Sequence, residues 1–111
     1  MQDPPKAIKR QVCEWAGVAH DRELSKALQK LRTQFDRWER AEISAADLND
    51  LIHRFHDGES REIWKKYATN HPEPALGLAV ATTIIRREEL PPSLAQYLAR
   101  VIELYEGNSG A

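Results

Sequence analysis

A run of large apolar residues at alternating intervals of four and three is the strongest structural signal in this sequence. The run lies between residues 21 and 40 and consists of Leu24, Leu28, Leu31, Phe35 and Trp38. Residues spaced in this way lie on one face of an α-helix, as they do at the seam between packed helices. The seam is only about two heptads long, so it predicts a helix of a globular bundle rather than an extended coiled coil.

The rest of the sequence shows similar helical periodicity, and no segment shows the apolar–polar alternation of a half-buried β-strand. Glycine and proline residues divide the chain between the periodic segments. We therefore expect six helices, over residues 4–16, 21–40, 44–57, 59–69, 74–89 and 92–106.

Local signals predict where several of these helices begin and end. Gly17 suits the left-handed position that follows a helix end, and Asp57-Gly58 predicts a second end. Ser44 is followed three residues later by Asp47, which is the pattern of a capping box at a helix start. The short fourth helix is expected to turn three residues inward: Ile63, Trp64 and Tyr67.

The fifth predicted helix is apolar on nearly all sides as far as Ile85, and a helix without a polar face is a central one. The length of 111 residues fits one domain. The predicted fold class is all-α: a single compact bundle of five to six helices with a buried, largely apolar fifth helix. The domain is expected to span residues 1–106, followed by a disordered C-terminal tail over residues 107–111.

The overall composition bounds the possible partners and location. A net charge of −1 gives no global sign of nucleic-acid or membrane binding. The longest apolar stretch, residues 75–85, is shorter than the ~20 residues that a membrane span needs, and the first residues do not resemble a signal peptide. The single cysteine, Cys13, excludes an intramolecular disulfide framework and is expected to be a small packing residue. We expect a cytoplasmic protein that does not enter a membrane.

One face of the second predicted helix is basic. At about 100° per residue its cations fall within roughly 80° of one another, nearly opposite the apolar seam. They are Arg22, Lys26, Lys30, Arg37 and Arg40. A row of this kind suits the phosphates of a polyanion. Acidic residues beside it dilute the field, and no aromatic residue on the stripe is available to stack a base, so a solvated surface is the favoured interpretation.

His53 and His56 lie among three aspartates. The spacing of Asp50 and His53 places an acid and an imidazole on one helical face, as in di-metal carboxylate bundles. The helical wheel turns His53, Asp50 and Asp57 away from the apolar residues, whereas a metal site in a bundle needs inward ligands. We therefore expect no metal and no cofactor. Enzymatic activity is not favoured and no catalytic residue is predicted, because the sequence contains no nucleophile elbow and no glycine-rich phosphate loop.

The last predicted helix has an unusually wide apolar face, of about 140°. Either this helix packs centrally beside the preceding one, or it leaves an apolar surface for a partner. Trp38, at the end of its helix beside two arginines, is a second candidate for a partner surface. The predicted partner-binding residues are Trp38, Tyr97, Val101, Leu104 and Tyr105.

These features favour a small non-catalytic helical interaction or regulatory module. It is expected to act as a homodimer or with a protein partner, because a symmetric homodimer is the commonest way to bury excess apolar surface. The alternative is nucleic-acid or other polyanion binding through the basic stripe.

Overall fold

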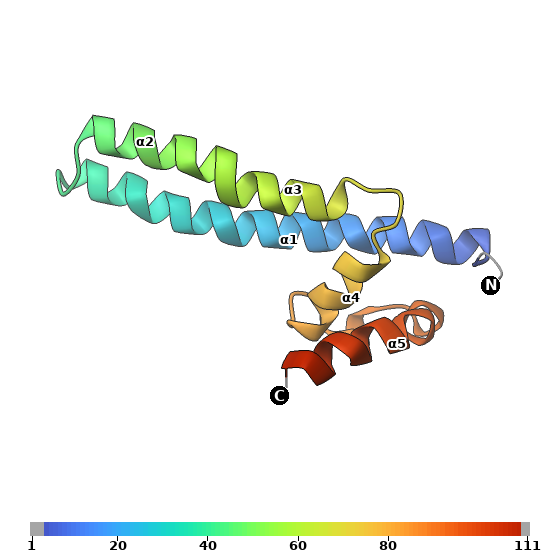
Figure 1. Cartoon of the computed structure of the whole chain (residues 1–111). Coiled ribbons are helices and arrows are strands. Elements are labelled where there is room, and N and C mark those ends of the chain that lie inside the picture. Colours follow the sequence, from blue (N-terminus) through green and yellow to red (C-terminus); the bar gives the residue numbers. More distant parts are fainter. Residues whose placement is uncertain (1–3, 110–111) are drawn as a thin grey trace.

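The computed structural model describes residues 4–109, and every regular element in that range is a helix (Figure 1). The all-α prediction is confirmed. The elements in chain order are α1 (Lys6–Glu39), α2 (Ala45–Phe55), the π-helical turn η1 (His56–Ser60), α3 (Arg61–Tyr67), α4 (Glu73–Ala81), the short 3-10 turn η2 (Arg87–Glu89) and α5 (Pro92–Ser109). Because α2, η1 and α3 follow one another without a gap, the described residues form four helical rods rather than five or six.

α1 joins the first two predicted helices into one helix of 34 residues, about 51 Å long at 1.5 Å per residue. The predicted helix end at Gly17 is wrong. Gly17 does not adopt a positive φ, and the buried residues Ala16 and Ala19 on either side of it belong to one inward stripe. Packing along this stripe outweighs the ~1 kcal/mol that a glycine costs in a helix interior.

Residues 45–67 fold back along α1 and form an antiparallel helical hairpin with it (Figure 1). The predicted capping box is confirmed at the start of α2. The Asp47 amide donates to Ser44 Oγ at 3.0 Å, and the Ser44 amide donates to Asp47 Oδ2 at 3.1 Å. The predicted helix end at Asp57-Gly58 is wrong, because the chain continues through η1, where a π-helical turn accommodates these residues without breaking the helix.

The fifth predicted helix ends early, at Ala81. Thr83 adopts the left-handed conformation, with a φ of 63°. The amides of Thr83 and Ile84 donate to the carbonyls of Val80 and Ala79 at 3.0 and 2.8 Å. This is the Schellman arrangement that closes a helix C-terminus, formed here without its usual glycine.

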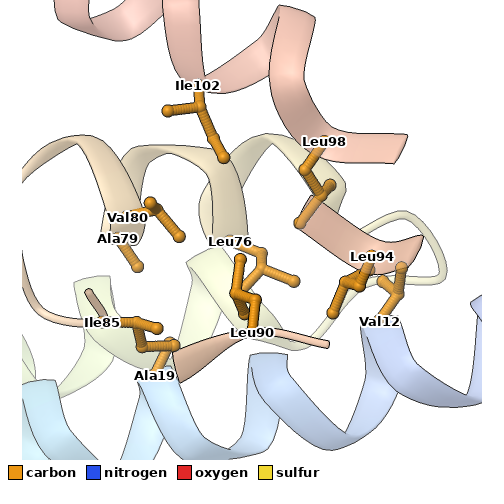
Figure 2. Close-up of a cluster of buried hydrophobic side chains, with 10 residues drawn as sticks. All are labelled: Val12, Ala19, Leu76, Ala79, Val80, Ile85, Leu90, Leu94, Leu98 and Ile102. Atoms are coloured by element: carbon orange, nitrogen blue, oxygen red, sulfur yellow. The ribbon is translucent and has the colours of Figure 1, made fainter. Parts of the chain in front are cut away.

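The main hydrophobic core joins α4, α5 and the first half of α1 (Figure 2). α4 and α5 pack against each other more extensively than any other pair of elements, and α4 also contacts α1. Gly77 allows this close approach, because a Cβ at that position would collide with the Val101 side chain of α5. The core cluster consists of Val12, Ala19, Leu76, Ala79, Val80, Ile85, Leu90, Leu94, Leu98 and Ile102.

The molecule is elongated rather than a single compact bundle. Its extents are 56 × 29 × 22 Å and its radius of gyration is 17.4 Å, against about 13 Å for a compact domain of this length. We call residues 24–67 the hairpin arm, and residues 73–109 together with residues 6–23 the C-terminal lobe. α5 runs to Ser109, so the helix includes the first residues of the tail that was expected to be disordered, and residues 110 and 111 lie outside the described range.

Candidate interaction surface

The hairpin arm has only two helical rods, so each rod buries only the narrow stripe that faces the other. Ala27 of α1 and Ile63 of α3 lie in this stripe and are buried. Larger apolar side chains beside them are only partly covered. Leu28 is 47% exposed, Phe35 is 40% exposed and Trp64 is 60% exposed. Part of the apolar seam recognised in the sequence therefore faces solvent.

One flank of the hairpin arm is polar. Lys30 Nζ lies 3.4 Å from Glu59 Oε1, and Lys66 Nζ lies 2.8 Å from Glu23 Oε1. These four residues line one surface cavity of about 330 Å³, so they lie on the same side of the arm. We call this side the polar flank.

The more exposed apolar residues Leu28, Phe35 and Trp64 lie on the opposite flank. Half-buried apolar residues also line a cavity on the polar flank, beside Lys30 and Glu59: Leu31, Leu51 and Phe55. At about 100° per residue, Leu28 and Lys30 fall on opposite sides of the buried Ala27. Trp64 and Lys66 are separated on α3 by the same angle. Because both lysines belong to the polar flank, Leu28 and Trp64 share the other flank. We call it the apolar flank. Measured from the buried Ala27, Leu24 and Phe35 lie on the same side as Leu28, and measured from the buried Leu48, Ile52 lies on the side that Trp64 takes relative to Ile63. The apolar flank therefore comprises Leu24, Leu28, Phe35, Ile52 and Trp64, of which Leu24 and Ile52 are half-buried.

The exposure of Trp64 follows from the π-helical turn that precedes it. A π-helical turn holds more residues than an α-helical turn, so η1 rotates the next segment until Ile63 and Tyr67 face α1. Trp64, which was predicted to face inward, is left on the outside. Its ring lines an open surface pocket of about 400 Å³ together with His56, Asp57, Ser60 and Arg61.

A polar cluster joins the end of α3 to the first half of α1. The Tyr67 ring stacks on His20 with 5.3 Å between the ring centroids, and Lys66 pairs with Glu23. Burial, together with the neighbouring Glu23 carboxylate, raises the pKa of Tyr67 above its ordinary value of 10.0. The Tyr67 hydroxyl is thus placed to donate a hydrogen bond to the Glu23 carboxylate.

The structure separates the residues that were predicted to bind a partner. Trp38 lies in the last turn of α1, at the tip of the hairpin arm, and the other four lie on α5 in the C-terminal lobe (Figure 1). Val101 packs against α4, and Tyr105 is half-buried. Tyr97 and Leu104 are exposed. The wide apolar face of the last helix is thus divided between the core and the surface.

Arg22, a member of the predicted basic stripe, joins α1 to the segment between α4 and α5. Its guanidinium binds Glu89 through two hydrogen bonds of 2.9 and 2.8 Å and also donates to the Ile84 carbonyl at 3.0 Å. The Glu89 carboxylate in addition accepts the Arg86 amide at 2.8 Å. Arg22 and this backbone amide lower the pKa of Glu89 from 4.5 to about 2.

Three further members of the basic stripe have carboxylate partners. Arg37 Nε and Arg40 Nη2 lie 3.7 and 3.2 Å from Glu42 Oε2, and Lys30 pairs with Glu59. Lys26 lines the cavity of the polar flank. The stripe is therefore largely engaged in intrachain ion pairs. The pairs of Lys30, Arg37 and Arg40 are exposed and contribute little on their own.

Other polar side chains do not converge on a metal centre. Among the described residues, no group of three or more His, Cys, Asp or Glu residues could hold a metal ion. His53 and His56 are exposed. Cys13 is exposed as well. The expectation that it is a small packing residue is wrong, because it lies about 100° around α1 from the buried Val12. Cys13 and His71 both line a cavity of about 460 Å³ beside the loop before α4.

Comparison with protein-family models, with curated proteins and with solved structures found no match to this chain. In the part of the chain that the structure describes, no helix has both the length and the apolar character needed to cross a membrane. Function is therefore inferred from the surface of the molecule itself.

Proposed function

We propose that the protein is a non-catalytic helical interaction module that binds a protein surface through the apolar flank of its hairpin arm. The observation that carries this proposal is the exposure of Leu28, Phe35 and Trp64 on one flank. A large apolar side chain contributes roughly 1.5–3 kcal/mol when it is fully buried. Each of these three is covered only in part, so a partner that covers the flank gains the remainder of this free energy.

The make-up of the apolar flank also supports the proposal. The centres of protein–protein interfaces are rich in aromatic residues and poor in charges, and the flank has Phe35 and Trp64 among its five members. The C-terminal lobe supports the arm, because its core holds the first half of α1. The proposal includes a homodimer or a protein partner, and a cytoplasmic location in which Cys13 stays reduced.

Site-specific photo-crosslinking in cells tests the proposal. A photo-reactive phenylalanine analogue at Phe35 is expected to give a discrete covalent adduct, because this side chain lies on the apolar flank. The same analogue at Gln29, which is exposed on the outer side of the same helix, serves as the control and is expected to give none. A Phe35 variant that gives no adduct above the Gln29 control contradicts the proposal.

The alternative, polyanion binding through the basic stripe, has less support because four of its five cations pair with carboxylates. The interaction-module proposal predicts no appreciable affinity for nucleic acid at physiological salt. The measurement is fluorescence anisotropy with a labelled duplex over a range of salt concentrations. An affinity for nucleic acid that falls steeply with salt, and that is lost when Lys26, Arg37 and Arg40 become glutamine, would instead support polyanion binding through the basic stripe.

A further inference from the structure

We infer that the partner on the apolar flank is a second copy of this chain, so that two hairpin arms pack together as a four-helix bundle. This inference rests on the proposed function and names the partner for it. The apolar flank on each copy is the surface that the other copy covers.

The exposed area of the chain supports a second copy. The chain exposes 7963 Å², whereas a compact monomer of the same mass, 12.7 kDa, exposes about 6,200 Å². The excess is therefore about 1,700 Å² per chain. An interface of standard size removes about 800 Å² from each partner. One interface of this size along the hairpin arm would remove about half of this excess.

The spacing of the apolar residues fits this arrangement. The intervals of four and three along α1 are those of helices that pack in four-helix bundles, yet the arm supplies only two rods. Leu28 and Phe35 are seven residues apart and occupy the same position in successive heptads. A second arm supplies the two rods that would complete the bundle around this seam.

The charges around the apolar flank also permit self-association. A surface that binds its own copy must be complementary to itself, and a border of a single charge sign would repel the copy. The exposed border on α1 contains both Arg32 and Glu39, and the net charge of the chain is only −1. Each copy therefore presents positive and negative side chains that can pair with opposite charges on the other copy.

Sedimentation equilibrium of the purified full-length chain tests the inference over about a hundredfold range of concentration. The expected mass at the upper end is twice 12.7 kDa. Leu28→Glu and Phe35→Glu are each expected to weaken dimerisation at least about tenfold, because each variant places a carboxylate in the apolar interface twice per dimer. Both positions are exposed in the single chain, so the variants should keep the helical circular dichroism of the wild type.

Leu104→Glu is the matched control, since it makes the same chemical change at a side chain that is 66% exposed on α5. This variant is expected to dimerise like the wild type. A wild-type chain that stays monomeric throughout, or a dimer that Leu104→Glu breaks and Leu28→Glu does not, overturns the inference. In that case an in-cell adduct at Phe35 with a mass other than two chains leaves the proposed function standing, whereas the absence of any adduct removes both.

Discussion

Two glycines in helices have opposite surroundings, although the sequence alone does not distinguish them. A Cβ added at Gly77 would collide with the Val101 side chain, whereas a Cβ added at Gly17 would meet nothing within 4 Å. The first glycine allows α4 and α5 to approach each other, and the second only loosens an exposed turn of α1.

The two glycines therefore predict opposite effects of the same substitution. Gly77→Ala is expected to lower the free energy of unfolding by about 1–3 kcal/mol through overpacking. Gly17→Ala is expected to raise it by about 0.5–1 kcal/mol, because alanine is the better helix former and has less conformational entropy when unfolded. Urea unfolding of both variants beside the wild type measures the two changes. Equal effects at the two positions would contradict the close packing of α4 on α5.

The ion pair between Arg22 and Glu89 predicts a pH dependence of stability. Because the pKa of Glu89 is lowered from 4.5 to about 2 in the folded chain, its stabilising contribution is complete above pH 4.5. The contribution is lost as the pH falls towards 2. Glu89→Gln should therefore be less stable at neutral pH and should lose less stability over that acidic range. Thermal unfolding at several pH values measures this, and parallel pH profiles for the two proteins would show that Glu89 has no such role.

Single side chains also show where the sequence was informative about the candidate site. Leu28 and Phe35 belong to a periodic seam, so their apolar face was predictable. Whether that face is covered depends on how many helices surround it, and periodicity does not carry this information. Arg22 was placed correctly on a solvent-facing stripe, but its partner Glu89 lies 67 residues away and only the fold brings the two together.

At the scale of the element, two helices end in the same way without the residue that this ending favours. Ala41 after α1 and Thr83 after α4 both have positive φ, of 59° and 63°. In each case the following amides return to carbonyls of the last turn, as in the Schellman motif. An L-residue in this conformation costs roughly 1–2 kcal/mol, which glycine avoids.

Glycine at these two positions is therefore expected to stabilise the protein. Ala41→Gly and Thr83→Gly should each raise the free energy of unfolding by about 0.5–1 kcal/mol, since the relief of strain exceeds the entropy that glycine loses on folding. Ala46→Gly, at an exposed position with ordinary helical φ in the first turn of α2, should not raise it and serves as the control. Chemical denaturation measures the free energy of unfolding of the three variants. A loss of stability in Ala41→Gly and Thr83→Gly would show that these residues do not adopt the left-handed conformation.

Element boundaries were predictable where a local hydrogen bond sets them. Ser44 and Asp47 form the capping box that their spacing predicted, because both partners lie within one turn. Gly17 and Gly58 were poor guides, because a glycine permits a helix end without requiring one. At Gly17 long-range packing continues the helix, and at Gly58 a π-helical turn absorbs the irregularity.

At the scale of the whole molecule, the all-α class followed from periodicity, but the elongated shape did not. Periodicity says which residues share a face of a helix. It does not say which faces meet, and here α4 and α5 cover only the first half of α1. The second half pairs with a single rod, which leaves the apolar flank open.

A dimer formed through that flank predicts that thermal stability depends on protein concentration. Mass action favours the associated state, so the melting temperature of the wild type should rise with concentration. For Leu28→Glu this rise should begin only at concentrations at least about tenfold higher than for the wild type, and Leu104→Glu should follow the wild type. Differential scanning calorimetry at several concentrations measures this, and a wild-type melting temperature that does not change would contradict self-association.

α1 runs without interruption from Lys6 to Glu39 and belongs to both the hairpin arm and the C-terminal lobe. Besides packing, α1 therefore fixes the distance and the rotation between the hairpin arm and the C-terminal lobe. A molecule bound to the arm and a molecule bound to the lobe would be held at a fixed separation and a fixed rotation about the helix axis, because the same helix belongs to both parts. Inserting a single residue between the two halves of α1 would rotate one binding surface by about 100° relative to the other. The rotational register of this helix therefore matters to the arrangement of bound molecules as much as its length does.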